Sequence, residues 1–214
     1  MAFENNYSTL DRLIHRLAFS TRSAQIAMAD AEDALLKKPL QEIKLKPPVF
    51  VTALPRAGTT LLLEILEASD EFFSHTYQDM PFILTPVLWS KVAGKFRKSA
   101  TQQERAHGDG MMVSVESPEA FEEAIWAAFW KQQYQANWVA PWDRRLNHPE
   151  FQRFFQQHMK KIAYLRQQAG DPAQRYLSKN NMNISRLAYI EKAFPDAAVL
   201  VPFRHPLQQS ASLL

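Results

Sequence analysis

The chain has 214 residues, of which 46% are hydrophobic and 22% are charged. This balance supports a folded core and excludes disordered and fibrous classes of protein. The formal net charge is +3 and the pI is about 9.1, with lysines and arginines scattered along the chain, so no nucleic acid partner is indicated. The absence of cysteine excludes disulfides, thiolate nucleophiles and cysteine-based metal sites.

The N-terminal sequence MAFENNYSTLDRLIHRL differs from a targeting segment. It carries acidic and polar residues where a secretory signal has a basic start followed by an apolar run. No stretch of the sequence reaches the roughly 18 consecutive apolar residues of a membrane-spanning helix. We therefore expect a soluble, cytoplasmic protein with no membrane span.

The first predicted helix begins at Ser8, where Asp11 is placed to complete a capping box. Its apolar residues recur at helical spacing, at Leu10, Leu13, Ile14 and Leu17. A connector with several prolines follows. We expect residues 1–46 to form an N-terminal helical segment and connector, and residues 47–214 to form the main domain.

A strand, a tight loop and a helix are predicted next. The apolar run 49–54 predicts a buried strand, and residues 55–58 predict the loop. From Thr59 onward the apolar positions lie on one helical face, as Leu61, Leu62, Ile65 and Leu66.

The middle of the chain, from about residue 80 to 170, is predicted to be mostly helical. One helix is expected after a cap at Ser117, and another carries several apolar residues and ends near Gly170. The region is rich in aromatic residues, namely Trp126, Phe129, Trp130, Tyr134, Trp138 and Trp142. Such residues can line a sugar or aromatic acceptor site, but large aromatic side chains mostly supply buried area, so we favour helical packing.

The last third alternates again between strands and helices. It predicts a short strand at 175–178, a helix at 184–194, a buried strand at 197–203 and a final helix opening after Arg204. This alternation predicts an α/β fold, with a parallel sheet flanked by helices and a largely helical middle insertion. Ligands of such sheets bind beyond the carboxyl ends of the strands.

The loop Pro55-Arg56-Ala57-Gly58-Thr59-Thr60 is a candidate anion site. A loop between a strand and a helix directs several backbone N–H groups, and the positive end of the helix, toward one point. Gly58 allows a close backbone approach, Thr59 and Thr60 add hydroxyl groups, and Arg56 adds a charged fork. An ordinary strand-to-helix turn is the alternative.

The phosphate loop of nucleoside triphosphatases is a rival interpretation. In its GxxxxGK(S/T) pattern the lysine follows the last glycine and the hydroxyl residue holds magnesium. Here the cation, Arg56, precedes the glycine, and Ala53 stands where the first glycine belongs. A nucleotide kinase or NTPase is therefore disfavoured.

A second motif lies near the end of the chain, where the strand predicted before Arg204 is followed by Ser212 eight residues later. A strand-end arginine and a hydroxyl on the next helix can converge on one phosphate. Together, the PRAGTT loop and this Arg-to-Ser spacing resemble the PAPS-dependent sulfotransferases, which have a P-loop-like fold; PAPS is 3′-phosphoadenosine-5′-phosphosulfate. The arginine in the first loop is similar to the branch containing tyrosylprotein sulfotransferases and their bacterial relatives. The resemblance covers residues 48–214.

This resemblance implies the following roles. Arg56, Ala57, Gly58, Thr59, Thr60, Arg204 and Ser212 would bind the cofactor PAPS. Arg56 and Lys179 would stabilise the transferred group and the leaving phosphate, without a metal. An acceptor hydroxyl would supply the nucleophile, and Asp79 is our preferred general base, with His75, whose intrinsic pKa lies near neutrality, as the other candidate.

Two alternatives stay open. One is a module that binds PAPS or another nucleotide without turnover, and the other, less favoured, is a P-loop kinase or NTPase. Members of the family continue well beyond the Arg-to-Ser element, whereas this sequence ends at Leu214. We therefore expect a sulfotransferase domain that is incomplete at its C-terminus.

Overall fold

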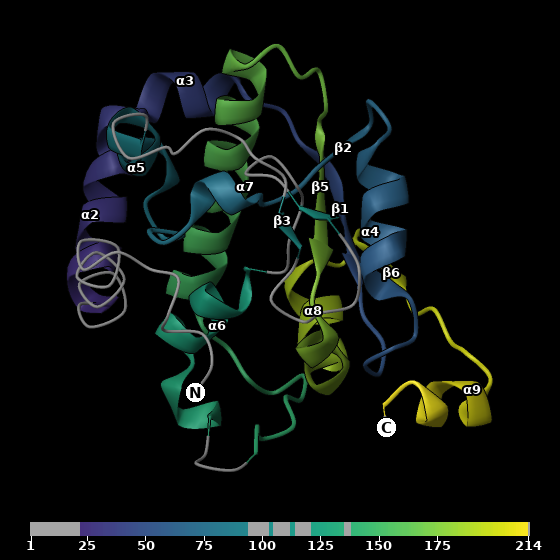
Figure 1. Ribbon diagram of the computed structural model, residues 1–214. Coiled ribbons are helices and arrows are strands. Elements are labelled where there is room, and N and C mark those ends of the chain that lie inside the picture. The colour runs from purple at the N-terminus through teal and green to yellow at the C-terminus, as the bar shows by residue number, and fades with distance from the viewer. Residues whose placement is uncertain (1–21, 94–102, 105–111, 114–120, 135–137, 214) are drawn as a thin grey trace, which may run out of the picture.

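The computed structural model describes residues 22–93, 103–104, 112–113, 121–134 and 138–213 (Figure 1). Its α-helices are α2 (Arg22–Leu35), α3 (Lys37–Glu42), α4 (Thr59–Glu67), α5 (Pro86–Ala93), α6 (Glu123–Phe129), α7 (Pro149–Gln168), α8 (Leu187–Ala193) and α9 (Pro206–Ala211). Its strands are β1 (Lys46–Val51), β2 (Phe72–Phe73), β3 (Gln103–Glu104), β4 (Met112–Val113), β5 (Arg175–Lys179) and β6 (Ala198–Leu200). Short 3-10 helices are η2 (Tyr77–Asp79), η3 (Lys131–Gln133) and η4 (Asn181–Arg186). The helix expected from Ser8 and the cap expected at Ser117 lie outside the described residues.

The central sheet has four strands in the order β2-β5-β1-β6, and every neighbouring pair is parallel. The predicted α/β fold is therefore confirmed. Val51 at the end of β1 is in register with Lys179 on β5 and with Leu200 on β6. The segments that follow these three strands consequently begin at the same edge of the sheet.

Side chains of β1 alternate between two apolar layers. Phe50 belongs to the large core cluster on the side of α7, whereas Val49 and Val51 pack with Leu63 of α4. Figure 1 shows α4 and α7 on opposite sides of the sheet. A central parallel strand with helices over both faces requires apolar residues at successive positions, which is why the run at 49–51 lacks a polar residue.

Helices α2 and α3 pack against α7 and share its core. Ala29 of α2 and Leu40 of α3 are buried in the same cluster as Phe50. The Nζ atom of Lys161, fully buried on α7, lies 3.0 Å from Glu32 Oε2. The division of the chain near residue 46 stays a prediction.

The middle region contains an aromatic core between α6, α7 and α8. Trp126, Trp130 and Trp142 are all buried, and the rings of Trp126 and Phe151 have centroids 4.5 Å apart. Helical packing, the favoured interpretation of the aromatic stretch, is confirmed for these three tryptophans, whereas Trp138 is exposed. Among the described residues, no helix is long and apolar enough to cross a membrane.

Three predicted element boundaries were wrong. β1 spans Lys46–Val51 instead of 49–54, and the helix predicted at 184–194 is divided into the 3-10 helix η4 and the shorter α8. β6 ends at Leu200 instead of 203, and it is not buried as predicted: Val199 is 38% exposed, because β6 is the last strand in the order of the described sheet. Pro202 has no N–H to continue the ladder, so the chain leaves the sheet before Arg204.

Candidate functional site

The loop between β1 and α4 has an unusual backbone. Gly58, the N-cap residue of α4, has φ 90°, and Arg56 has φ 67°. Nothing lies within 4 Å of a Cβ added at Gly58, so the backbone angle, and not crowding, favours glycine there. A left-handed arginine costs about 1–3 kcal/mol, a strain that is common at ligand-binding sites.

The candidate anion site lies at the start of α4. The first backbone N–H groups of a helix have no partners within the helix, and they lie at its positive end. Thr59 is buried at this position and Thr60 is partly exposed. Arg56 and Ala57 precede them on the surface of the loop.

The two predicted cofactor elements lie in contact. Arg56 Nε donates a hydrogen bond to Ser212 Oγ at 2.9 Å, although the two residues are 156 positions apart. Gln209 Nε2 of α9 donates to the carbonyl oxygen of Pro55 at 2.8 Å. Figure 1 shows α9 beside the β1–α4 loop and outside the packed layers.

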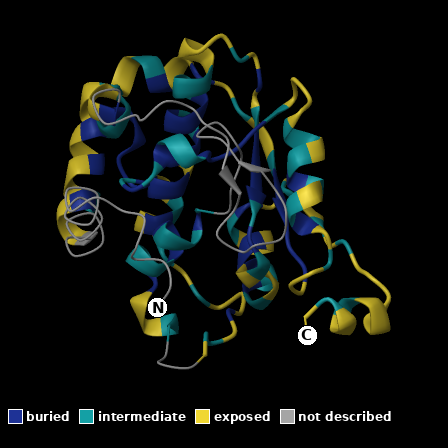
Figure 2. Ribbon diagram, viewed as in Figure 1, coloured by how far each residue is buried: buried dark blue, intermediate teal, exposed yellow. Residues whose placement is uncertain are grey.

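Arg204 lies on the segment that joins β6 to α9, four residues beyond the end of the strand. Its side chain is exposed, and its neighbour Phe203 is 93% exposed. Most of α9 is exposed as well (Figure 2). The segment therefore reaches the β1–α4 loop through polar contacts rather than through a shared apolar core.

Residues after β5 complete this edge of the sheet. Lys179 is the last residue of β5, in register with Val51. Thr59 Oγ1 donates to Asn181 Oδ1 at 3.1 Å, and Thr52 Oγ1 donates to the Asn181 carbonyl at 3.3 Å. The prediction included Lys179 and missed Asn181, although its place just beyond a predicted strand was a usable signal.

Asn180 is held by an ionic cluster in which Arg186 is buried and Glu123 is partly exposed. Its Nδ2 donates to Glu123, which also accepts from Arg186 at 2.7 Å. Arg186 is fully buried, with its guanidinium carbon 4.5 Å from the Trp126 ring centroid and 4.9 Å from that of Trp142. The cluster fixes the start of η4, and with it Asn181.

His75, one of the two predicted general bases, is buried just after β2. Its Nε2 lies 2.8 Å from His158 Nε2, and its Nδ1 lies 3.1 Å from Tyr176 Oη. Tyr176 donates to Glu122 at 3.0 Å, so its oxygen accepts from His75 Nδ1 and His75 Nε2 accepts from His158. Burial lowers the pKa of His75 to about 4, and it raises the pKa of Glu122.

Asp79, the preferred general base, is also buried and engaged. Its Oδ2 accepts from the backbone N–H of Thr76 at 2.8 Å and from Arg166 at 2.9 Å. These bonds close a capping box at η2 and attach it to α7. In this conformation both ring nitrogens of His75 and the Oδ2 atom of Asp79 are bonded within the protein. The catalytic role of the two residues stays a prediction.

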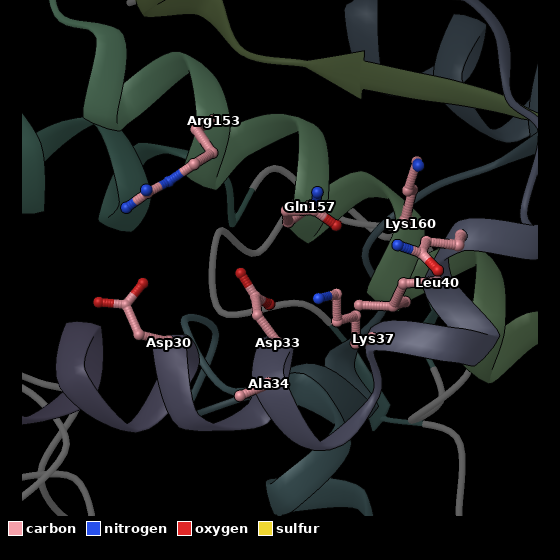
Figure 3. A pocket seen from close by; sticks show the side chains of 9 residues that line it. Asp30, Asp33, Ala34, Lys37, Leu40, Arg153, Gln157 and Lys160 are labelled. Atoms are coloured by element: carbon pink, nitrogen blue, oxygen red, sulfur yellow. The ribbon is translucent and has the colours of Figure 1, made fainter.

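A cavity of about 450 Å³ lies elsewhere, between α2, α3 and α7. Figure 3 shows Asp30 and Asp33 of α2 facing Arg153 and Gln157 of α7 across it. None of the predicted cofactor or catalytic residues lines this cavity. Within the described ranges, no group of three or more His, Asp or Glu side chains is arranged to hold a metal ion.

Two solved structures resemble the chain. Sulfotransferase STF9 from Mycobacterium avium aligns with 13% identity and a TM-score of 0.48, over 92% of this chain and 53% of that one. Sulfotransferase STF1 from Mycobacterium tuberculosis H37Rv aligns with 18% identity and a TM-score of 0.44, over 94% and 55%. The chain thus spans about half the length of these two proteins.

No curated protein matches the sequence. A family model does match: the one described as "Sulfotransferase family" covers residues 47–214, which is most of the chain. The protein therefore belongs to the sulfotransferase family.

Proposed function

We propose that this protein binds PAPS and transfers its sulfuryl group to an acceptor hydroxyl. The observation that supports this most directly is the contact between Arg56 and Ser212, which joins the two predicted cofactor elements. One element would bind the 5′-phosphosulfate and the other the 3′-phosphate. Each would bind an anion, and only a ligand with two separate anionic groups uses both.

The reaction requires an oxygen nucleophile in line with the sulfur–oxygen bond that breaks. As the new S–O bond forms, negative charge grows on the 5′-phosphate of the leaving adenosine 3′,5′-bisphosphate, and cations must neutralise it. Arg56 and Lys179 would supply this charge. The N–H groups at Gly58, Thr59 and Thr60 would hold the 5′-phosphate in place.

The second element would hold the 3′-phosphate. Arg204 would supply a charged fork and Ser212 a hydroxyl. Arg56 and Ser212 would exchange their mutual hydrogen bond for bonds to the nucleotide. Because Arg204 and α9 are exposed, this side of the site can adjust its position when the nucleotide binds.

Binding without turnover is the second candidate function. It is favoured by the bonds that occupy His75 and Asp79, since transfer to a hydroxyl needs a group that accepts its proton. Incubation with radiolabelled PAPS and a panel of sugar, phenol, lipid and peptide acceptors separates the two functions. Labelled product indicates transfer, and nucleotide binding without product indicates a binding module.

The direct test is isothermal titration with adenosine 3′,5′-bisphosphate. We expect saturable binding, without added metal, that is stronger than the binding of adenosine 5′-monophosphate. Magnesium-dependent binding of ATP or GTP would instead favour a kinase or NTPase. Absence of binding by a folded protein would overturn the proposal.

A further inference from the structure

Asn181 connects the two threonines that flank the β1–α4 loop. Its side-chain oxygen accepts from the Thr59 hydroxyl and its carbonyl oxygen accepts from the Thr52 hydroxyl. Thr52 directly follows β1 and Thr59 begins α4. The Oδ1 atom and the carbonyl oxygen of Asn181 thus hold the two ends of the loop. Neither bond uses the two N–H donors of Nδ2.

A donor remains available in either orientation of the amide. With Oδ1 toward Thr59, as in this structure, Nδ2 is left to donate elsewhere. With the amide rotated, Nδ2 donates to the Thr59 oxygen, and the Thr59 proton is left to donate instead. Their contact uses one of the three donors of this pair, so Asn181 and Thr59 keep two further donors in either orientation.

The surroundings of this pair favour a negatively charged acceptor. Residues 52–60 contain one arginine, Arg56, and no aspartate or glutamate. Thr59 is also the first residue of α4, at the positive end of the helix. Asn181 is half-buried, and Thr59 is buried, so a hydrogen bond formed here is partly protected from water.

We propose that Asn181 is a binding residue of the donor site, which together with Thr59 donates a hydrogen bond to the 5′ anionic group of the nucleotide. This inference rests on the proposed function and adds to it a residue outside the two predicted cofactor elements. It explains why a polar amide is held at the start of η4, just after β5, where the contacts with Thr52 and Thr59 define its position.

Two substitutions test the proposal. Asn181→Ala removes the amide and frees the Thr59 hydroxyl. Asn181→Asp keeps the shape, turns the Thr59 proton toward the new carboxylate and places a negative charge beside the anion. Gln168→Glu is the matched control, because it makes the same amide-to-carboxylate change at the exposed C-terminal end of α7, near the start of β5 rather than its end.

The measurement compares two nucleotides that differ only at the 5′ position. Adenosine 3′,5′-bisphosphate has the 5′-phosphate and adenosine 3′-monophosphate lacks it. Ligand-observed NMR and calorimetry give the affinity of each protein for both. We expect Asn181→Ala to weaken binding of the bisphosphate about 10-fold and Asn181→Asp about 100-fold, the range typical of a lost hydrogen bond to a charged group.

Binding of the 3′-monophosphate should change less than about 2-fold in both variants, because it lacks the group that Asn181 contacts. Equal losses for both nucleotides, or bisphosphate binding by Asn181→Asp that matches Gln168→Glu, would overturn the inference while leaving the proposed function intact. A wild-type protein that binds neither nucleotide would overturn the proposed function and the inference with it. Should thermal unfolding show that Asn181→Asp does not fold, the ratio of the two affinities in Asn181→Ala decides.

Discussion

The carboxyl ends of β1 and β2 lie at the same edge of one parallel sheet, but their polar residues are used differently. After β2, His75 and Asp79 are buried and bonded to α7 and β5. After β1, the loop at 55–58 is largely exposed, with a left-handed arginine and the free N-terminus of α4 beside it. A polar residue at this edge of the sheet is therefore not necessarily a binding residue. If its partners are all protein atoms, it stabilises the fold instead.

Substitution of the buried Asp79 should have the largest effect, and this effect is on the free energy of unfolding. Asp79→Ala removes the partner of Arg166, whose side chain is only 14% exposed. Breaking a buried ion pair leaves an uncompensated charge, so the free energy of unfolding should fall by about 3 kcal/mol. Urea unfolding measures this loss. Asp70→Ala, at an exposed position, is the control and should have almost no effect.

The nucleotide affinity of Asp79 variants tests the same assignment in a second way. If Asp79 is structural, Asp79→Ala should bind adenosine 3′,5′-bisphosphate within about 2-fold of wild type at a temperature where it is folded. A folded Asp79→Asn variant that retains PAPS binding but makes no product would contradict the structural role. It would restore Asp79 as the general base.

The exposed loop should show the opposite pattern. Arg56→Gly removes the guanidinium and suits the left-handed backbone at φ 67°. In Arg56→Gly the free energy of unfolding should stay unchanged or rise by up to about 1 kcal/mol, while the affinity for the bisphosphate falls about 30-fold. Calorimetry and urea unfolding of one preparation measure both quantities. A clear loss of stability with unchanged affinity would reverse our assignment.

The pH dependence of stability probes the buried histidine. The pKa of His75 falls to about 4 on folding, so between pH 6.5 and pH 4 the unfolded chain binds a proton that the folded protein does not. Stability should therefore decrease as the pH is lowered through this range, by about 1 kcal/mol per pH unit from His75. The buried Glu122 acts in the opposite sense, because its pKa is raised on folding.

The variant His75→Gln separates the contribution of His75 to this pH dependence from that of Glu122. The loss of stability between pH 7 and pH 5, measured by urea unfolding, should be smaller in His75→Gln than in wild type. His205→Gln, at an exposed position before α9, should behave like wild type. Identical pH dependence in all three proteins would show that His75 is protonated equally in the folded and unfolded states.

The smallest expected effect comes from the exposed end of the site. Ser212→Ala removes one neutral hydroxyl, whose oxygen accepts from Arg56. We expect an affinity for adenosine 3′,5′-bisphosphate about 5-fold weaker and no change in thermal stability. Unchanged affinity for this nucleotide, with a loss confined to stability, would make the Arg56–Ser212 bond purely structural.

Much of the fold could be predicted from apolar patterns. The apolar run at 49–51 gave a strong signal, because a strand covered on both faces must be apolar. The strand predicted at 175–178 gave a weaker one, because only Tyr176 and Leu177 in it are apolar. The end of β6 was placed too late, because periodicity alone did not show that Pro202 would stop the ladder. The candidate anion-binding loop was also visible, since its glycine, threonines and arginine adjoin one another in sequence.

The pairing of buried polar groups could not be predicted in the same way. The partners of His75 are 83 and 101 residues away, and nothing near it in the sequence indicates them. Asp79 differs in part, because its capping-box bond to Thr76 lies three residues away and its spacing is readable, whereas its other partner, Arg166, is 87 residues away. A titratable residue shortly after a strand is equally compatible with catalysis and with a buried network, and only the tertiary contacts distinguish the two.

A crystal structure of the protein with adenosine 3′,5′-bisphosphate would show whether the two elements bind one nucleotide. We predict the 5′-phosphate at the backbone N–H groups of Gly58, Thr59 and Thr60, and the 3′-phosphate beside Arg204 and Ser212. A nucleotide bound in the cavity between α2 and α7, with the β1–α4 loop uninvolved, would contradict this prediction.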